Sequence, residues 1–361
     1  MLNENLKKHY KPNESITVDE QLFPYKGHTK FTQFMPSKPA KYGIKIFWTC
    51  DSSNAYPLQG QIYTGKPLDE QRQVNVGEKT VLDLVQFYKG SGRNITKDNF
   101  FTSLQLARVL NSWRMTLVGT VRKDKPWLPS NMQASKDRAI LSTNFAFREN
   151  ETLCSYVPKR NKSVVLLSSM HGTAEVEENL TAKPSIIKYY NKTKSGVDTM
   201  DKMVTEYTTK RRTNRWPLAL FYNITDVAAL ASYIIFLEHN ENVRRTDSRR
   251  LFLKDLAKQL CLPAIQNRSS IPRVMGHYFT RTSIEIVLGQ ELFQEVVAED
   301  HSQTPRDKTG RIPVVGSCFI CRELSHKQRK TRKVCSICHK PICNEHCVNK
   351  PTCNICKQKA Q

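Results

Sequence analysis

The sequence predicts a mixed α/β protein that ends in a separate cysteine-rich module. Three observations support this prediction. Alternating or apolar runs interleave with amphipathic segments along the first third of the chain. The composition is that of a globular protein, with 39% hydrophobic and 25% charged residues over 361 positions. Eight of the 11 cysteines fall between Cys318 and Cys356. We therefore expect a main α/β region and a small domain behind it.

Within the main region, the order of elements is three strands, a helix, a strand, a helix and a strand. The turn-like segment "SSNAYP" separates the second strand from the third, and Ser103 is a candidate helix cap. This is the order of an RNase H-like sheet, in which the first and fourth strands are neighbours. In chain order, the segments are residues 15–28, 42–52, 57–66, 79–90, 93–103, 103–113 and 115–122.

Four aspartates in this framework are candidate catalytic residues. Asp19 lies on the first strand and Asp98 follows the short fourth one, so both can meet at one sheet edge. The segment "SGVDTMDKM" adds Asp198 and Asp201, which are nearly one helical turn apart and so share one side of an amphipathic helix. A second interpretation remains open for this segment, because Ser195 followed by Asp198 also fits a helix-capping box.

Carboxylates from Asp19, Asp98 and Asp198 would repel one another unless a divalent cation lay between them. Oxygen ligands of this kind suit Mg²⁺ or Mn²⁺. A pair of such ions can activate a water or a 3′-OH and stabilise the leaving oxygen at a phosphodiester. We therefore expect these three aspartates to bind magnesium or manganese, with Asp201 as a further acid.

The charge balance indicates a polyanionic partner. The chain carries 56 Lys and Arg against 33 Asp and Glu, a formal net charge of +23, which favours double-stranded DNA. A membrane partner is not expected, because the N-terminal residues lack an apolar core. The most apolar run, residues 218–237, has Asn223 and Asp226 near its middle. A central Asp costs about 2.5 to 3.5 kcal/mol on insertion scales, so a buried helix is the better interpretation.

The strip "TKRRTNRW" follows the helix that carries the last two acids. We expect its four cations to follow the DNA backbone near the active site. Trp216 has two open interpretations, stacking on an unstacked base or packing beside Pro217. The candidate DNA-binding residues are Lys210, Arg211, Arg212, Arg215 and Trp216.

The tail contains four close pairs of soft ligands, the number that two tetrahedral zinc sites require. The intervals between pairs are too short for two independent fingers, so we expect a cross-brace in which pairs one and three share one zinc and pairs two and four the other. Adjacent Cys347 is an alternative to His346, and a disulfide framework is the alternative for the whole set. The pairs are Cys318 and Cys321, Cys335 and Cys338, Cys343 and His346, and Cys353 and Cys356.

Several segments in this order resemble the piggyBac transposase family and its domesticated derivatives: "TVDEQ", "PSKPAKYGIKI", "RNITKDNFFTS", "KSGVDTMDKM" and "TKRRTNRWPLALFY", followed by the C5HC2 tail. The resemblance covers nearly the whole chain. It implies that Asp19, Asp98 and Asp198 are the catalytic aspartates, with Asp201 beside the last. It also implies cleavage at transposon ends, a hairpin intermediate and joining at TTAA.

The resemblance further implies an insertion between the second and third aspartates, a helical dimerisation and DNA-binding segment, a homodimer when full length, and a nuclear location. The basic run "SHKQRKTRK" is a candidate phosphate-contacting loop or nuclear-import signal. Family members have a longer N-terminal region, so a truncated copy is also expected. The predicted domains are 1–124, catalytic core; 125–183, insertion; 184–207, last core helix; 208–295, helical segment; 296–314, linker; and 315–361, zinc-binding domain.

Three functions follow from these features. The first is a metal-dependent DNA transposase, an enzyme of phosphodiester hydrolysis and transesterification. The second is a catalytically inactive, transposase-derived DNA- or chromatin-binding protein. The third is a cross-brace module that acts as a ubiquitin ligase or histone reader, which explains the tail but not the four aspartates. The intact acids favour the first.

Overall fold

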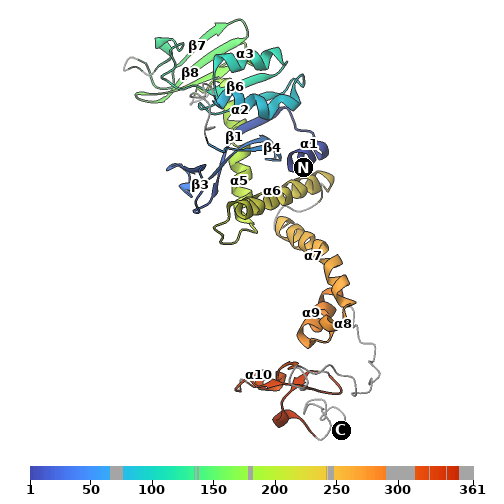
Figure 1. Cartoon of the computed structure of the whole chain (residues 1–361). Helices are drawn as coiled ribbons and strands as arrows, with labels where there is room; N and C mark the ends of the chain where they lie inside the picture. The colour runs from blue at the N-terminus through green and yellow to red at the C-terminus, as the bar shows by residue number, and fades with distance from the viewer. Residues whose placement is uncertain are drawn as a thin grey trace. The chain divides into compact units, whose positions relative to one another are not determined.

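The computed structural model divides the chain into two compact units, residues 1–250 and 251–361 (Figure 1). The described residues are 1–65, 76–133, 135, 138–177, 182–240, 242, 248–289, 314–324, 326–338 and 340–348. The predicted linker, residues 296–314, lies outside this set except for Val314.

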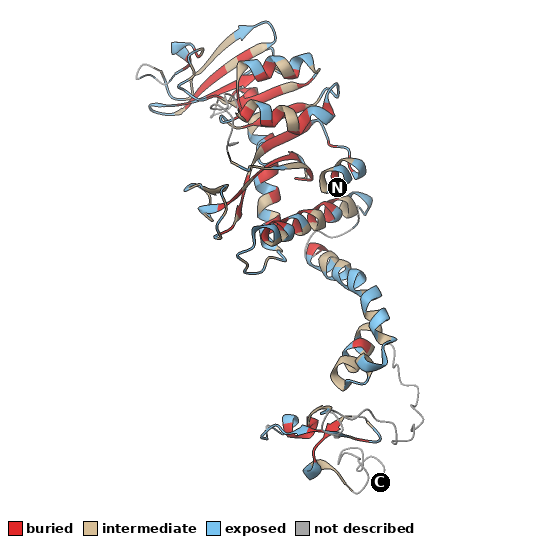
Figure 2. Cartoon of the chain, in the orientation of Figure 1, coloured by how far each residue is buried: buried red, intermediate tan, exposed pale blue. Residues whose placement is uncertain are grey.

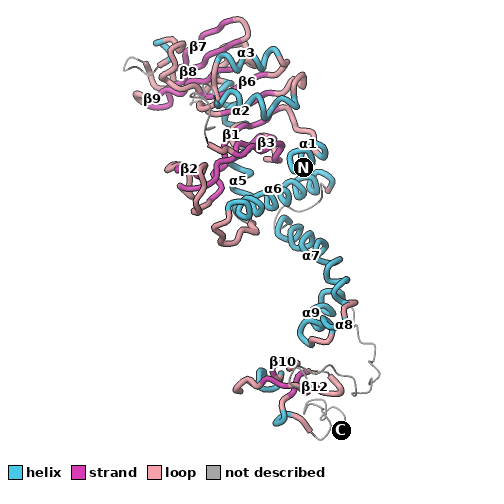
Figure 3. Tube along the Cα trace, viewed as in Figure 1, coloured by secondary structure: helices cyan, strands magenta, loops and turns pink. Residues whose placement is uncertain are grey.

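The first unit is built on one nine-stranded sheet with the order β2-β3-β1-β5-β6-β9-β8-β7, in which β4 also pairs with β3 (Figure 3). The predicted RNase H-like order is confirmed, because the first strand lies between the second and the fourth. The strands are β1 Ser15–Pro24, β2 Thr32–Phe34, β3 Tyr42–Asp51, β4 Pro57–Ile62, β5 Asn94–Lys97, β6 Thr116–Thr120, β7 Thr143–Arg148, β8 Glu151–Lys159 and β9 Lys162–Ser168.

The register around β1 determines which side chains share the sheet edge. β1 runs antiparallel to β3 and parallel to β5, with Val18 opposite Lys97. Side chains alternate along a strand, so Ile16 and Val18 enter the hydrophobic core while Thr17 and Asp19 belong to the other face. Asp19 and the residue after Lys97 therefore lie beside each other, just past the last paired residues of β1 and β5.

Helices cover this sheet and close the core (Figure 2). Amphipathic spacing explains most of them, and Ser103 caps its helix as expected, since its hydroxyl accepts from Leu106 N at 3.0 Å. The helices of this unit are α1 Leu2–His9, α2 Val76–Val85, α3 Leu104–Ser112, α4 Ser185–Thr193, α5 Gly196–Glu206 and α6 Trp216–His239, with short 3₁₀ turns at Gln86–Tyr88 and Ser130–Met132.

The predicted insertion continues the main sheet. β9 pairs antiparallel with β6, and β8 and β7 follow at the outer edge. Most of the apolar run "SVVLLSSM" lies in β9. A separate cluster of buried side chains, including Cys154, Leu166 and Ile186, packs this extension against α4.

Helix α6 is the apolar run noted in the sequence. Among the described residues it is the one helix long and apolar enough to cross a membrane by length and composition. The two polar residues near its middle, Asn223 and Asp226, are buried and hydrogen-bonded. Asp226 accepts hydrogen bonds from the Thr208 hydroxyl at 2.6 Å and from Thr209 N at 2.8 Å, and Asn223 bonds to Gln21. These contacts and the burial of its apolar residues in the core agree with a core helix.

The second unit contains the helices α7 Ser248–Ser269, which begins within the first unit's limits, α8 Pro272–Met275 and α9 Tyr278–Leu288. Most described side chains of α7 are exposed, as Figure 2 shows. The tail that follows has little regular structure: β10 Gly316–Ser317, α10 Phe319–Glu323, β11 Lys330–Thr331, β12 Lys333–Val334, β13 Pro341–Ile342 and a 3₁₀ turn at Asn344–His346.

Candidate functional site

Asp19 and Asp98 are neighbours across the parallel pair β1 and β5. Burial, followed by the negative charges of Glu20 and Asp98, raises the pKa of Asp19 to about 8. Burial also raises the pKa of Asp98. A pocket that resists ionisation of two carboxyl groups favours a cation between them.

A buried lysine shapes the turn that carries Asp98. Lys97 is fully buried and donates to the carbonyl of Phe101 at 3.0 Å. The Thr102 hydroxyl donates to the carbonyl of Asp98 at 2.8 Å, and the backbone N–H of Phe100 donates to Asp98 Oδ1 at 2.9 Å. The direction of the Asp98 carboxylate is therefore set by its own turn.

Helix α5 brings the second pair of acids to β1. Its first residue, Gly196, packs so closely that a Cβ there would lie 2.6 Å from the Thr17 hydroxyl. The capping interpretation of Ser195 is wrong: its side chain makes no capping hydrogen bond. Only two residues separate α4 from α5, and Ser195 has ψ 7° rather than the extended backbone that a side-chain cap requires.

Lys38 lies near three of the four acids, Asp19, Asp198 and Asp201. Its Nζ is 3.5 Å from Asp198 Oδ1 and donates to the carbonyl of Glu20 at 3.1 Å. Burial lowers the pKa of Lys38, but the charges of Asp19, Asp198, Glu20 and Asp201 outweigh that effect and raise it overall. Sequence reasoning missed this lysine, although it stands in the quoted segment "PSKPAKYG".

The four aspartates are neighbours, but their carboxylate oxygens do not converge on one position. In the described parts of the chain, only a cysteine and histidine group of the tail places three or more ligand atoms within 4.8 Å of one another. Lys38 forms an ion pair with Asp198 and also feels the charges of Asp19 and Asp201, so its ammonium supplies part of the positive charge that these acids require. Their carboxylate donors, their mutual repulsion and the raised pKa of Asp19 fit a hard divalent cation.

A buried amide network holds Asp201. Gln21 Nε2 donates to Asp201 Oδ1 at 2.7 Å, while Gln21 Oε1 accepts from Trp48 Nε1 at 3.0 Å and from Asn223 Nδ2 at 3.0 Å. Gln21, Trp48 and Asn223 are all buried. Burial raises the pKa of Asp201, and the bond from Gln21 opposes that rise. The network connects α6 to β1, β3 and the acid on α5.

The predicted DNA-binding strip forms the loop between α5 and α6. Lys210 donates to the carbonyl of Pro24 at 2.6 Å, and Arg211 donates to carbonyls within its own loop. Arg212 and Arg215 are exposed. Trp216 is 39% exposed and packs edge-on against Phe31, with ring centroids 5.3 Å apart. Packing against Phe31 thus covers part of the Trp216 ring. Stacking of its exposed part on a base stays a prediction.

The tail brings together two of its four predicted pairs. Cys318, Cys321, Cys343 and His346 place their ligand atoms within 4.8 Å of one another. The Sγ atoms of Cys321 and Cys343 are 3.8 Å apart. Ligands about 2.3 Å from a tetrahedral zinc lie about 3.8 Å from each other, so this group fits zinc. The predicted sharing of one site by pairs one and three agrees with this group.

The other half of the tail is only partly described. Cys335 and Cys338 lie near the first group, whereas Cys353 and Cys356 lie outside the described residues. His346 Nδ1 is 3.3 Å from Cys343 Sγ, while the Cys347 thiol donates to the carbonyl of Val348. The geometry therefore favours His346 over Cys347 as the fourth member of the first group. The second zinc site remains a prediction.

Comparison with known proteins gives the family. A protein-family model described as Transposase IS4 matches residues 1–233. Human PiggyBac transposable element-derived protein 3 is 29% identical over 233 residues, covering 60% of this chain and 39% of the relative. Human PiggyBac transposable element-derived protein 2 is 25% identical over 248 residues, covering 63% of this chain and 41% of the relative.

A solved structure matches over a greater part of the chain. The cryo-EM structure of the piggyBac transposase synaptic complex with hairpin DNA has 35% sequence identity and a TM-score of 0.75, covering 98% of this chain and 71% of that one. The chain spans about two fifths of the length of the two human relatives. From the match over residues 1–233 and this structural likeness, the chain belongs to the piggyBac-type Transposase IS4 family.

Proposed function

We propose that the chain carries the catalytic core of a metal-dependent DNA transposase. The observation that supports this most strongly is the register of β1 and β5, which makes Asp19 and Asp98 neighbours while α5 delivers Asp198 and Asp201 to the same place. Asp19, Asp98 and Asp198 would hold Mg²⁺ or Mn²⁺. When bound, such ions activate the attacking oxygen and stabilise the leaving oxygen of a phosphodiester.

The chain's own residues provide the rest of the site. Gln21 fixes the direction of Asp201, and the turn at Asp98 fixes that carboxylate. Lys38 offsets part of the negative charge of the cluster. The next residue, Pro39, lines a cavity together with the cations of the α5 to α6 loop, a surface suited to DNA phosphates. By family likeness, the substrate is a transposon end and the target is TTAA.

Cleavage of an end-labelled duplex, taken from the termini of the element that encodes the chain, tests this proposal. Full-length protein with its zinc retained should cut with Mg²⁺ and not without added divalent cation. Asp19→Asn, Asp98→Asn and Asp198→Asn should each lower the rate at least about 100-fold, since each removes a charged metal ligand. Asp255→Asn, an exposed acid on α7, is the matched control.

The second candidate is a DNA- or chromatin-binding protein without catalysis. The names of the two human relatives, which call them transposable element-derived, favour keeping it. Wild-type protein that binds the labelled duplex and leaves it intact with both Mg²⁺ and Mn²⁺ would establish this candidate and exclude the first.

The same proposal includes zinc in the tail, a nuclear location and a homodimer. Metal analysis of the purified chain, imaging of a tagged chain in cells, and light scattering with and without DNA test these three points separately. A monomer on DNA would exclude the dimer without affecting the proposed chemistry.

A further inference from the structure

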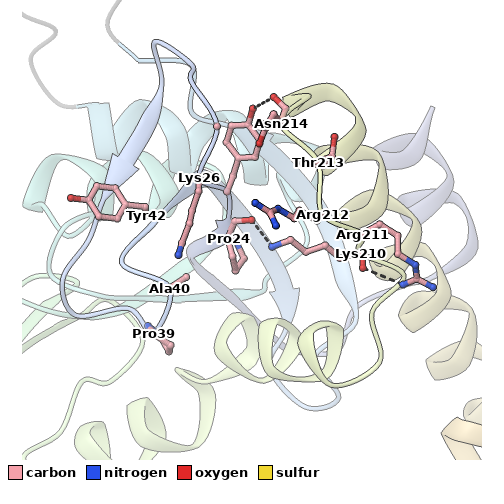
Figure 4. A pocket seen from close by; sticks show the side chains of 13 residues that line it. Pro24, Lys26, Pro39, Ala40, Tyr42, Lys210, Arg211, Arg212, Thr213 and Asn214 are labelled. Atoms are coloured by element: carbon pink, nitrogen blue, oxygen red, sulfur yellow. Dashed lines mark hydrogen bonds between the residues drawn. The ribbon is translucent and has the colours of Figure 1, made fainter.

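A cavity of about 620 Å³ opens within the first unit (Figure 4). Three loops contribute to it: the one after β1, the one before β3, and the loop between α5 and α6. Its volume is in the usual range for small-ligand sites. The lining residues are Pro24–Gly27, Pro39, Ala40, Tyr42, Lys210–Asn214 and Ala219.

Two hydrogen bonds fix the walls of this cavity. Lys210 Nζ donates to the carbonyl of Pro24 at 2.6 Å, and the Tyr25 hydroxyl donates to the carbonyl of Asn214 at 2.6 Å. Both ends of the α5 to α6 loop are thus attached to the last residue of β1 and the residue after it. Gly27 is required for this arrangement, because a Cβ there would lie 2.1 Å from the Tyr25 hydroxyl. The cavity is therefore formed before any ligand arrives.

The charge of the lining is entirely positive. Among the described residues, the charged groups that line it are all cations, and no Asp or Glu does so: Lys26, Lys210, Arg211 and Arg212. Lys26 and Arg212 have neither an ion pair nor a hydrogen bond from their side chains to any described residue, and Figure 4 shows both within the ring of lining residues. Two unpaired cations in a preformed cavity suit a phosphate group.

An aromatic surface lies at the rim. Tyr42 lines the cavity and is 50% exposed, and its ring packs against Phe34, which is 57% exposed, with centroids 4.7 Å apart. Exposed rings next to cations are typical of sites that stack unpaired bases. The combination of a phosphate site and a stacking surface points to a nucleotide rather than to a free anion.

The cavity and the acids lie within reach of one DNA strand. Pro24 is five residues beyond Asp19 on the same strand, a distance of about 16 Å at 3.3 Å per residue. On the other side, Pro39 follows Lys38, which contacts Asp198. A DNA strand that reaches the acids would therefore reach the cavity within about five nucleotides at the spacing of a duplex strand.

We propose that this cavity receives one unpaired nucleotide of the DNA bound at the acid cluster, with its phosphate on Lys26 and Arg212 and its base against Tyr42. This inference rests on the proposed DNA function and specifies where a distorted or single-stranded nucleotide is held.

Fluorescence anisotropy at one fixed salt concentration, without divalent cation, tests the inference on the full chain. Three labelled probes are compared: a blunt 20-base-pair duplex, the same duplex with one extra unpaired thymidine nucleotide, and the duplex with an abasic residue at that place. We expect the wild type to bind the thymidine probe about tenfold more tightly than the blunt duplex, with the abasic probe in between. Free thymidine monophosphate should compete weakly, which distinguishes a nucleotide within DNA from a free one.

Two variants test the proposed roles of Tyr42 and Arg212. Tyr42→Ala should reduce the preference for the thymidine probe to about twofold or less and leave blunt-duplex affinity within about twofold. Arg212→Ala should weaken the thymidine probe more than the blunt one. Arg160→Ala removes an exposed arginine from the turn between β8 and β9 and is the matched control, expected to keep the preference.

The outcomes separate this inference from the proposed function. A wild type that binds blunt and bulged DNA equally, or a preference that survives both Tyr42→Ala and Arg212→Ala, overturns the nucleotide site and leaves DNA binding intact. A wild type that binds no probe overturns both. Thermal melting of each variant confirms that the fold is retained.

Discussion

The acid cluster and the cysteine group are both candidate metal sites, yet the protein builds them in opposite ways. The acids lie on elements of a large sheet whose core consists of aliphatic and aromatic side chains. In the described part of the tail, four of the seven buried core residues are cysteines: Cys318, Cys321, Cys335 and Cys343, with Phe319, Ile320 and Ile342. The first site is held in place by a fold, whereas the second is a large part of its own fold.

This difference has opposite energetic consequences. At the acid cluster, folding brings repelling carboxyl groups together, so the site costs stability until a cation binds. In the tail, so few apolar residues are buried that the metal itself must supply the stability. Metal removal should therefore lower the stability of the folded sheet region but unfold the tail.

The largest expected effect is chelation of the tail. Removing zinc should unfold residues 314–348, because structural zinc contributes about 10 to 16 kcal/mol of apparent binding energy in finger peptides. Hydrogen exchange with and without chelator would show protection lost in the tail and kept in the sheet. A measured stoichiometry of one zinc would contradict the cross-brace, and protection that persists in the metal-free tail would contradict the whole comparison.

The amide network gives the next effect, in the first unit. Gln21→Leu should destabilise the protein by about 3 kcal/mol, because it leaves Trp48 Nε1 and the Asn223 amide buried without their shared partner. Denaturant unfolding monitored by tryptophan fluorescence measures this. Gln61→Leu, at an exposed position on β4, is the control. Equal stability of the two variants would mean that the network does not hold α6 to the sheet.

Asp19→Asn should stabilise the protein in the absence of divalent cation, by roughly 2 kcal/mol at neutral pH. The folded pKa of about 8 exceeds the ordinary value of 3.8. The wild type therefore loses stability as the pH rises from about 4 towards 8, and the asparagine variant does not. The gap in melting temperature should widen from pH 5 to pH 8 and narrow when Mg²⁺ is added.

Asp255→Asn, on the exposed face of α7, is the control for that measurement. A melting gap that stays constant between pH 5 and pH 8 would show that Asp19 ionises as easily in the folded chain as in the unfolded one.

The smallest expected effect is that of Cys347→Ser. Because His346 rather than Cys347 faces the three thiols, the variant should keep the wild-type zinc content, whereas Cys343→Ser should release metal. Zinc content after dialysis is the measurement. Release from Cys347→Ser together with retention in His346→Ala would reverse the assignment.

Much of this organisation could be predicted from the sequence, because local pattern determined it. Alternation and turn residues marked β1, β3 and β4, and the order of elements implied that Asp19 and Asp98 would be neighbours. The spacing of cysteine pairs predicted which two pairs share a site. In each case, the information lies in short local patterns and in the order in which they follow one another along the chain.

The remaining features depend on contacts between distant segments. Gln21 meets Asn223 across 202 positions, and no local pattern reveals that pairing. Lys38 lies in a loop whose path is set by its packing. The failure at Ser195 has the same origin, since the close approach of Gly196 to β1 overrides the local preference for a cap.

The raised pKa of Asp19 also bears on the history of the chain. A neutral residue in its place would make the protein more stable, so random substitution in a copy freed from selection for DNA chemistry would tend to remove this acid. Substitution of Gln21 would instead lower the stability of the protein, because it leaves the buried Trp48 and Asn223 side chains without their hydrogen-bond partner. A copy that decays under selection for folding alone should keep the amide and lose the carboxylate. This chain keeps Asp19, against the gradient of stability.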